Sequence, residues 1–183
     1  TKAVESGIPV KINAVLQKGM NEDEWLPLTQ LAKNLPLSVR FIEMMPIGYG
    51  NIPQSISNEE LKEKIMRYYG NLTEDFRIYG NGPAVYYSIE GFKGNIGFIS
   101  AIHGKFCNLC NRIRMTSTGD IKPCLCYEQR WALKPALRME HKEKRQESIQ
   151  KILIESIKNK PQMHCFENVK SVSEKHFMGQ IGG

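Results

Sequence analysis

The chain has 183 residues, of which 41% are hydrophobic, and its 25 Lys and Arg outnumber its 19 Asp and Glu. This length provides for one domain, or for one domain and part of another, and no segment has the ~20 consecutive apolar residues that a membrane-spanning helix needs. The net charge of +6 favours anionic partners such as nucleotides, nucleic acid or phosphate groups. Because the polar start has neither an initiator Met nor a signal peptide, we expect a cytoplasmic chain that is part of a longer protein.

The first predicted elements form a βαβ unit. Residues 8–16 and 37–44 are nearly continuous apolar runs, which is typical of strands buried on both faces. Residues 25–35 between them place apolar side chains at helical spacing. Because a helical crossover joins strands that run in the same direction, we expect these two strands to be parallel.

Further along the chain, the pattern predicts a second helix, short strands and a last helix. Ser57-Asn-Glu-Glu60 is a capping box, and the helix that it opens should end at Gly70. Apolar residues at helical spacing predict another helix over residues 148–158. Between these helices, Gly-rich turns separate short apolar runs, which indicates antiparallel strands over residues 84–89, 94–100 and 110–116.

Four of the five cysteines lie within twenty residues of one another, at Cys107, Cys110, Cys124 and Cys126. Cys165 stands alone. Without a secretion signal, such clustering indicates metal ligands rather than disulfides. Two residues separate Cys107 from Cys110, so both sulfurs can face one point, and a hairpin turn at Ser117-Thr-Gly-Asp120 should carry the chain back beside them. The spacing allows an iron–sulfur cluster or zinc, and by spacing alone zinc is the commoner answer.

Two arginines follow the second cysteine on a predicted strand. Residues alternate faces along a strand, so Arg112 and Arg114 should share a face with Cys110. Two guanidiniums beside a metal site suit a phosphate or carboxylate, because each planar group can donate two hydrogen bonds. The alternative is a pair of solvated surface arginines, which is the usual environment of Arg.

Ordered motifs along nearly the whole chain are similar to the C-terminal half of the MoaA family, the GTP 3′,8-cyclases of molybdenum cofactor biosynthesis. The similar segments are Val10–Asn13, Arg40–Pro46, Gly91–Ser100, Phe106–Thr116 and Lys160–His164. The terminal Gly-Gln-Ile-Gly-Gly resembles the end of that family too. The similarity is weak only over residues 127–147. Because the motifs follow the family's order along nearly the whole chain, the set as a whole is highly specific.

The resemblance implies a radical S-adenosylmethionine (SAM) enzyme that converts GTP to 3′,8-cyclo-7,8-dihydro-GTP. In that family an iron–sulfur cluster in the N-terminal half cleaves SAM to a radical, which removes hydrogen from the GTP ribose. A second 4Fe-4S cluster, in the C-terminal half, binds the guanine base at an iron that has no cysteine ligand. Three cysteines suit that role, since an open coordination position lets a cluster bind substrate.

The resemblance also implies roles for individual residues. It makes three cysteines ligands of the second cluster: Cys107, Cys110 and Cys124. It makes four residues contacts of GTP: Lys11, Arg112, Ile113 (through its backbone) and Arg114. Met45 corresponds to a residue that packs against SAM, and Gly182 and Gly183 to a tail that enters the active site and acts there with the two arginines. Without the resemblance, Lys11 would be interpreted as a solvent-facing residue and Met45 as a core residue.

Two departures from the family pattern bear on function. Position 126 is Cys where the family usually has an aromatic residue, and a fourth ligand there would close the open iron. Because one residue separates it from Cys124, we expect Cys126 to point away. The Cys-x3-Cys-x2-Cys motif of the SAM-cleaving cluster is absent from these residues, as is the first part of the barrel. We therefore predict that the chain alone is catalytically inactive.

These observations predict an α/β fold: the end of a partial TIM-like (β/α) barrel, a small antiparallel cluster-binding region and C-terminal helices. Residues 1–70 would hold the last βα units of the barrel, and residues 71–183 the region that binds the cluster and GTP. The expected partners are GTP, SAM and the missing N-terminal half of the barrel, with no nucleic acid and no membrane. A homodimer is compatible with the resemblance.

Two other functions fit parts of the sequence. A zinc-binding nucleic-acid module would explain the positive charge, the cysteines and Arg112-Ile-Arg114, but no second clear cysteine pair completes a zinc ribbon. A carrier protein ending in Gly-Gly, as ubiquitin-like proteins do, would leave the cysteines without a role. Measuring whether the protein contains iron or zinc tests the first alternative, and an assay for C-terminal adenylation tests the second.

Overall fold

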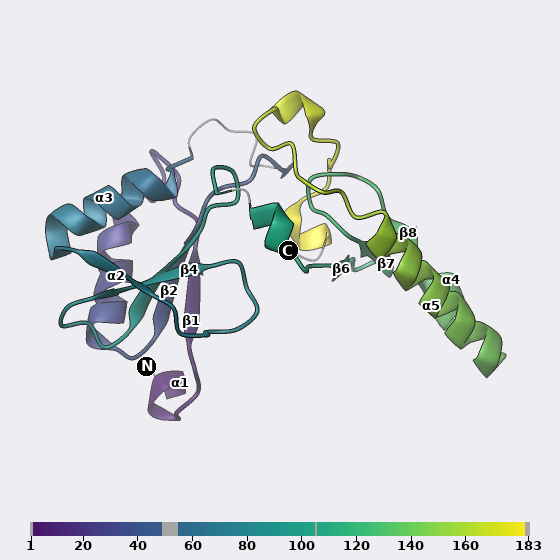
Figure 1. Ribbon diagram of the computed structural model, residues 1–183, viewed down its shortest axis with the longest axis horizontal. Helices are drawn as coiled ribbons and strands as arrows, with labels where there is room; N and C mark the ends of the chain where they lie inside the picture. Colours follow the sequence, from purple (N-terminus) through teal and green to yellow (C-terminus); the bar gives the residue numbers. More distant parts are fainter. Residues whose placement is uncertain (1, 49–54, 105, 182–183) are drawn as a thin grey trace. The chain divides into compact units, whose positions relative to one another are not determined.

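The structure is a computed structural model, and it describes residues 2–48, 55–104 and 106–181 of the chain (Figure 1). The chain forms two compact units. The first consists of Thr1–Met44 and Pro53–Phe106, and the second of Met45–Ile52 and Cys107–Gly183. Among the described residues, no helix is both long and apolar enough to cross a bilayer.

A mixed five-stranded sheet forms the centre of the first unit, in the order β1-β2-β5-β4-β3. Its strands are β1 (Lys11–Ala14), β2 (Ser38–Ile42), β3 (Leu72–Asp75), β4 (Val85–Ile89) and β5 (Asn95–Ile99). β1, β2 and β5 run parallel to one another, whereas β4 and β3 are antiparallel to their neighbours. The parallel pairing of β1 with β2, with α2 (Trp25–Asn34) between them in the chain, confirms the predicted βαβ unit. Two short helices, α1 (Lys2–Glu5) and η1 (Glu22–Glu24), lie in the same stretch of chain.

The helix α3 (Asn58–Tyr69) has the two ends that the sequence predicts. The Ser57 Oγ accepts a hydrogen bond from the Glu60 N–H at 3.1 Å, which caps the first turn. At the other end, the Gly70 N–H donates to the Met66 carbonyl oxygen at 2.9 Å. Gly70 has a φ of +93°, a conformation that favours glycine. Local signals therefore suffice to fix both ends of this helix.

Helices α2 and α3 form a single hydrophobic core with one face of this sheet (Figure 1). Alternate residues of β2 and β5 point into that core, namely Val39, Phe41, Ile96 and Phe98. Ala32 of α2 and Leu61 and Ile65 of α3 are buried against them. The rings of Phe41 and Phe98 stack with their centroids 6.1 Å apart. Burial of this apolar surface is the main force that holds the first unit together.

The opposite face of β1 and β2 is polar. Lys11 and Asn13 are exposed, and the Arg40 Nε donates to the Asn13 Oδ1 at 2.7 Å. Gly97 lies beside Arg40 in the sheet, and a Cβ at Gly97 would come 3.0 Å from side-chain atoms of both Arg40 and Tyr86. The prediction that β1 is buried on both faces is wrong for the first unit, in which the described helices cover one face only.

The predicted antiparallel strands divide between two sheets. β4 and β5 pair as expected, but β5 also pairs in parallel with β2, which places both strands in the first unit. Within residues 110–116 only β6 (Arg114–Met115) is a strand, and it forms a separate antiparallel sheet with β7 (Asp120–Lys122) and β8 (Trp131–Ala132). The mixed α/β class is confirmed. The second compact unit consists of Met45–Ile52 and the chain after Phe106, while the predicted functional division at residue 70 stays a prediction.

The hairpin of β6 and β7 is the centre of the second unit. It turns where the sequence predicts, and Gly119 in the turn has a φ of +87°. The helix α5 (Lys142–Lys158) contacts β7 and β8, and it begins earlier than the predicted residue 148. The buried Lys122 of β7 forms an ion pair with the buried Glu174, which fixes the C-terminal segment to the hairpin. Among the described residues, other short helices are η3 (Phe106–Leu109), α4 (Lys134–Leu137), η4 (Val169–Ser171) and η5 (Met178–Gln180).

Candidate functional site

Cys107 and Cys110 lie on one tight turn. Cys107 is part of the 3-10 helix η3 and Cys110 follows it directly. The Cys110 N–H donates to the Cys107 carbonyl oxygen at 3.0 Å, and both thiols are free and partly exposed. The backbone therefore has the turn that a two-residue spacing requires if both sulfurs are to reach one metal centre.

Cys124 approaches these two cysteines from β7. The β6–β7 hairpin reverses the chain, which returns toward Cys110 just before Cys124. Burial raises the pKa of the Cys124 thiol, and the neighbouring thiols of Cys107 and Cys110 raise it further, although a backbone hydrogen bond and a nearby Lys oppose this. The three predicted ligands thus lie within electrostatic reach of one another.

Lys160, on the segment after α5, connects the chain segment that follows Cys110 with the segment that precedes Cys124. Its Nζ donates to the Arg112 carbonyl oxygen at 2.6 Å and to the Pro123 carbonyl oxygen at 2.9 Å. The same Nζ lies 3.6 Å from the Cys110 Sγ. One ammonium therefore contacts the chain on both sides of the hairpin and a predicted ligand. The sequence reasoning included Lys160 in a family motif but gave it no role.

A second donor comes from the same segment. The His164 N–H donates to the Cys107 Sγ at 3.4 Å. Hydrogen bonds and positive charge at a ligating sulfur stabilise thiolate and tune the potential of an iron–sulfur cluster. Neither contact could be predicted by spacing, because about fifty residues separate each donor from its cysteine.

Arg114 is the more enclosed of the two predicted substrate arginines. Burial lowers the pKa of its guanidinium, the thiols of Cys110 and Cys124 oppose that shift, and the positive charge of Arg112 adds to it. Arg112 itself is exposed, and Ile113 between the two is 40% exposed. The structure therefore brings both arginines close to the cysteines.

The predicted cause of this proximity is wrong. The sequence predicts a strand over residues 110–116, on which alternating side chains would place the arginines on the same face as Cys110. In the structure only Arg114–Met115 is a strand. The Arg112 carbonyl oxygen accepts from Lys160 instead of from a neighbouring strand. Arg112 is therefore positioned by the Lys160 hydrogen bond and Arg114, in β6, by its pairing with Lys122, and no continuous strand joins them to Cys110.

Cys126 has a partner that the sequence did not indicate. Cys126 is fully buried, and its Sγ lies 3.0 Å from the Sγ of Cys165. Burial raises the pKa of Cys126 to about 12, and the neighbouring Cys165 contributes. The interpretation of Cys165 as an isolated cysteine is therefore wrong, because the fold places it against Cys126.

The other predicted site residues lie elsewhere in the chain. Lys11, in the first unit, begins β1 and donates to the Tyr79 carbonyl oxygen. Met45 belongs to the second unit and is partly buried. Gly182 and Gly183 lie outside the described residues. The roles given to these four residues stay predictions.

The donor set has the chemistry of an iron–sulfur site. Three free thiols come from two adjoining loops, and an ammonium and a backbone N–H contact two of them. As they stand, no three His, Cys, Asp or Glu side chains among the described residues form a group that could hold a metal ion. The thiols and the donors beside them therefore fit a cluster by chemical type alone, and the described side chains are not assembled as a metal-binding group.

Residues 37–166 match the family model described as Molybdenum Cofactor Synthesis C. The chain belongs to this family. The matched range contains the three predicted ligands, both arginines, Lys160 and the Cys126–Cys165 contact. The resemblance to the C-terminal half of MoaA is thereby confirmed.

Relatives of this molybdenum cofactor synthesis C chain are named GTP 3′,8-cyclase. One from Clostridium perfringens is 41% identical over 182 residues, which cover 100% of this chain and 55% of the relative. One from Desulforamulus reducens is 40% identical over 187 residues, covering 100% and 56%. One from Moorella thermoacetica is 36% identical over 185 residues, covering 99% and 55%. The chain thus spans just over half the length of these relatives.

In this family member, a buried carboxylate that the sequence did not single out connects two segments of the first unit. Glu43, at the end of β2, accepts hydrogen bonds from the N–H groups of Asn58 (3.1 Å), Ile102 (2.9 Å) and His103 (3.1 Å). The His103 Nδ1 lies 3.0 Å from the same carboxylate. Glu43 thereby ties the start of α3 to the loop that leads from β5 toward Cys107.

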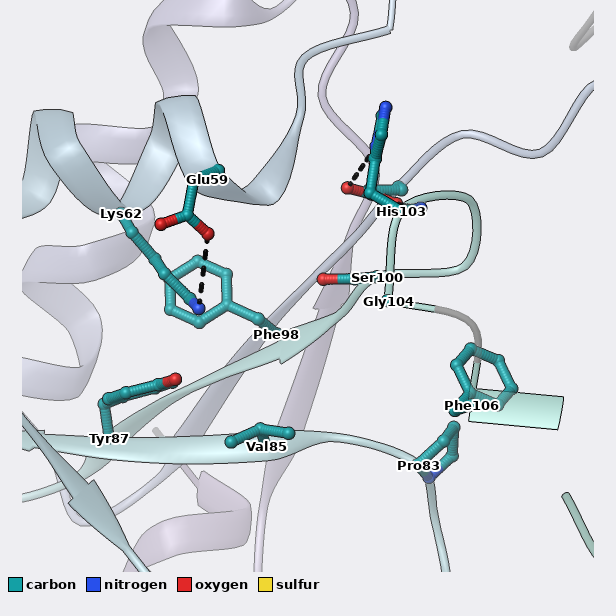
Figure 2. Close-up of a pocket in the computed structure, with 11 residues that line it drawn as sticks. Glu59, Lys62, Pro83, Val85, Tyr87, Phe98, Ser100, His103, Gly104 and Phe106 are labelled. Carbon is teal, nitrogen blue, oxygen red and sulfur yellow. Dashed lines mark hydrogen bonds and ion pairs between the residues drawn. The ribbon is translucent and has the colours of Figure 1, made fainter. Parts of the chain in front are cut away.

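Figure 2 shows the cavity beside this carboxylate, which has a volume of about 290 Å³. The Lys62 Nζ lies over the rings of Tyr87 and Phe98, 4.9 and 5.4 Å from their centroids, and 3.7 Å from a Glu59 carboxylate oxygen. His103 and Glu43, which contact each other, also line the cavity. None of the predicted site residues lines this cavity.

Glu43→Gln is expected to remove an acid-sensitive part of the stability of the first unit. Burial alone would raise the pKa of Glu43, but its hydrogen bonds outweigh burial and hold the pKa below the ordinary 4.5. The ionised group therefore contributes stability above pH 4.5, and this is lost as the pH falls through the folded-state pKa. At neutral pH the amide should lower the free energy of unfolding by about 2 kcal/mol, because it cannot accept all four bonds.

Chemical denaturation over a series of pH values between about 3 and 7 measures this effect. Glu147→Gln, an exposed substitution on α5, is the matched control and should keep the native stability. A Glu43→Gln variant with the native pH dependence would show that Glu43 does not carry the acid sensitivity.

Proposed function

We propose that the chain is the C-terminal part of a GTP 3′,8-cyclase of molybdenum cofactor biosynthesis, and that this part holds the second 4Fe-4S cluster and binds GTP. The names of the relatives support the activity, since they are similar over the whole of this chain. The observation that carries the proposal is the position of Lys160, whose ammonium contacts the Cys110 Sγ and the Arg112 and Pro123 carbonyl oxygens in the unit that also contains Cys107, Cys124 and Arg114.

Cys107, Cys110 and Cys124 would hold the cluster, with the Lys160 ammonium and the His164 N–H donating to its sulfur ligands. When bound, the cluster supplies a Lewis-acidic iron without a cysteine ligand, at which the guanine base can bind. The positive charge around the thiols also suits a trianionic or tetra-anionic nucleotide.

The arginines would orient the nucleotide. Arg114 is partly desolvated, so each hydrogen bond that its guanidinium donates to a phosphate oxygen is stronger than it would be in water. The exposed Arg112 would donate to the same triphosphate and place it before the reaction begins. By the family resemblance, the backbone of Ile113 and the Lys11 ammonium would make further GTP contacts, and Gly182 and Gly183 would approach the reacting groups.

The first unit would complete an active site together with a barrel. Parallel strands with their helices on one face are the arrangement of a TIM-like barrel wall, and the inner face of that wall would be the one with Lys11, Asn13 and Arg40. We propose that the N-terminal part of the relatives supplies the remaining strands, the SAM-cleaving cluster and the SAM that would pack against Met45. A cytoplasmic location and a homodimer stay predictions.

GTP binding by the cluster-loaded chain tests the proposed substrate. Arg114→Ala should weaken GTP binding about tenfold to a hundredfold, since it removes charge-assisted hydrogen bonds worth roughly 1.5–3 kcal/mol. Isothermal titration without oxygen measures the dissociation constant. Arg138→Ala, an exposed arginine at the end of α4, is the matched control and should bind GTP as the native chain does. Native affinity in Arg114→Ala would argue against the proposed role of that guanidinium.

The chain alone is expected not to turn over GTP. The motif that binds the SAM-cleaving cluster is absent from its 183 residues, so no group present would generate the radical. Incubation of the cluster-loaded chain with SAM, GTP and a reductant, followed by chromatography of the nucleotides, measures this. Formation of 3′,8-cyclo-7,8-dihydro-GTP would contradict the assignment of radical generation to the missing half.

A further inference from the structure

The two cysteines outside the predicted cluster form a close pair in the second unit. The Sγ atoms of Cys126 and Cys165 lie 3.0 Å apart, with one thiol donating to the other. The Cys165 N–H donates to the Cys126 Sγ at 3.3 Å, and the Cys165 Sγ donates to the Ser171 carbonyl oxygen at 3.1 Å. A disulfide has its sulfurs about 2.0 Å apart, so a shift of about 1 Å would bring these two within bonding distance.

We propose that Cys126 and Cys165 are a redox-active thiol pair, a disulfide-forming site distinct from the three predicted cluster ligands. The pairing gives each of these two cysteines a partner outside the group of Cys107, Cys110 and Cys124. Cys126 is fully buried and Cys165 is partly exposed, so Cys165 is the thiol that an oxidant reaches first.

The oxidant is a small-molecule disulfide such as oxidised glutathione. The Cys165 thiolate attacks one sulfur of the oxidant, which forms a mixed disulfide and releases one molecule of thiol. Cys126 then attacks the Cys165 sulfur, which closes the protein disulfide and releases the second thiol molecule. Two electrons pass from the protein to the oxidant, and the two thiol protons leave with the two released thiol molecules.

The disulfide would have a structural consequence for the candidate site. Cys126 lies just after β7, whereas Cys165 directly follows the segment with Lys160 and His164, the donors to the predicted cluster ligands. A covalent link would tie that segment to the hairpin even if the segment opened. The 39-residue separation of the two cysteines also restricts the unfolded chain, so oxidation should raise the unfolding temperature.

A variant that retains only this pair tests the proposal without any cluster. In Cys107→Ser/Cys110→Ser/Cys124→Ser, treatment with excess oxidised glutathione should remove both free thiols. The intact chain should become lighter by the mass of two hydrogen atoms, with no bound glutathione and no cross-linked dimer. Retention of both thiols, one glutathione on each, or cross-linked dimers alone would overturn the proposal.

Two further variants on that background separate the roles of the cysteines. Adding Cys126→Ser should leave Cys165 to hold one glutathione, because no second thiol can displace it. Adding Cys165→Ser should leave the buried Cys126 unmodified. The reverse pattern, with glutathione on Cys126 only, would contradict the order of attack.

The native chain provides a measurement that does not depend on the folding of the Ser variants. After oxidation, blocking of free thiols and digestion with trypsin, peptides 115–130 and 159–170 should be joined by a disulfide. Fragmentation between Cys124 and Cys126 then identifies the linked residue. A link through Cys124, or the absence of any link to Cys165, would show that the pair is not the oxidation site.

Discussion

Cys107→Ala is expected to abolish assembly of the iron–sulfur cluster. The native chain, reconstituted without oxygen, should hold about four iron and four sulfide ions per chain. Cys107 shares its turn with Cys110, and the loss of one of only three thiolates leaves the cluster without enough protein ligands. Iron and acid-labile sulfide should therefore fall to near background, and the broad visible absorbance should disappear with them.

Matched cysteine variants make this prediction specific. Cys126→Ser and Cys165→Ser should retain the native iron content, because these two thiols contact each other. Cys110→Ala and Cys124→Ala should behave like Cys107→Ala. Loss of iron in Cys126→Ser would make Cys126 a ligand and would contradict an open iron.

Lys122→Met is expected to destabilise the second unit by about 3–5 kcal/mol, the usual result of removing one partner of a buried ion pair. The side chains of Lys122 and Glu174 are both fully buried. Arg130 lies 3.6 Å from the Glu174 carboxylate and His176 lies 2.8 Å from it, but neither replaces the buried ammonium. Chemical denaturation at neutral pH, followed by a probe in the second unit, measures the loss.

The pH dependence distinguishes a lost ion pair from lost packing. Burial alone would raise the pKa of Glu174, and the hydrogen bonds from Lys122 and His176 outweigh it and keep the pKa below its ordinary value. Without Lys122 the pKa of Glu174 should rise. The loss in the free energy of unfolding of Lys122→Met should therefore become smaller in acid, where Glu174 takes up a proton. Lys158→Met, at the exposed end of α5, should change stability by no more than about 0.5 kcal/mol. An equal loss in the free energy of unfolding at every pH would contradict the electrostatic explanation.

The parts of the fold that local patterns determine could be predicted from the sequence. The capping box and Gly70 fix both ends of α3, and the apolar runs indicate β1 and β2. The assembly of the sheet could not be predicted, because β5 pairs with β2 across more than fifty intervening residues. That distant pairing places β4 and β5 in the first unit rather than beside the cysteine hairpin.

The candidate site also combines local features, which the sequence predicts, with long-range contacts, which it does not. The turn that holds Cys107 and Cys110 and the hairpin that precedes Cys124 are local features, and the sequence predicts both of them. Lys160 and Cys165 reach the site from beyond α5, so no spacing rule relates them to their partners. The strand predicted over residues 110–116 is interrupted by one of these distant contacts, the Lys160 hydrogen bond to the Arg112 carbonyl oxygen.

Metal and sulfide analysis of the native chain, purified without oxygen, tests the central claim most directly. We predict about four iron and about four sulfide ions per chain, a brown colour and little zinc. One tightly bound zinc ion per chain with no sulfide would contradict the cluster assignment. It would favour a zinc-binding module at the same cysteines.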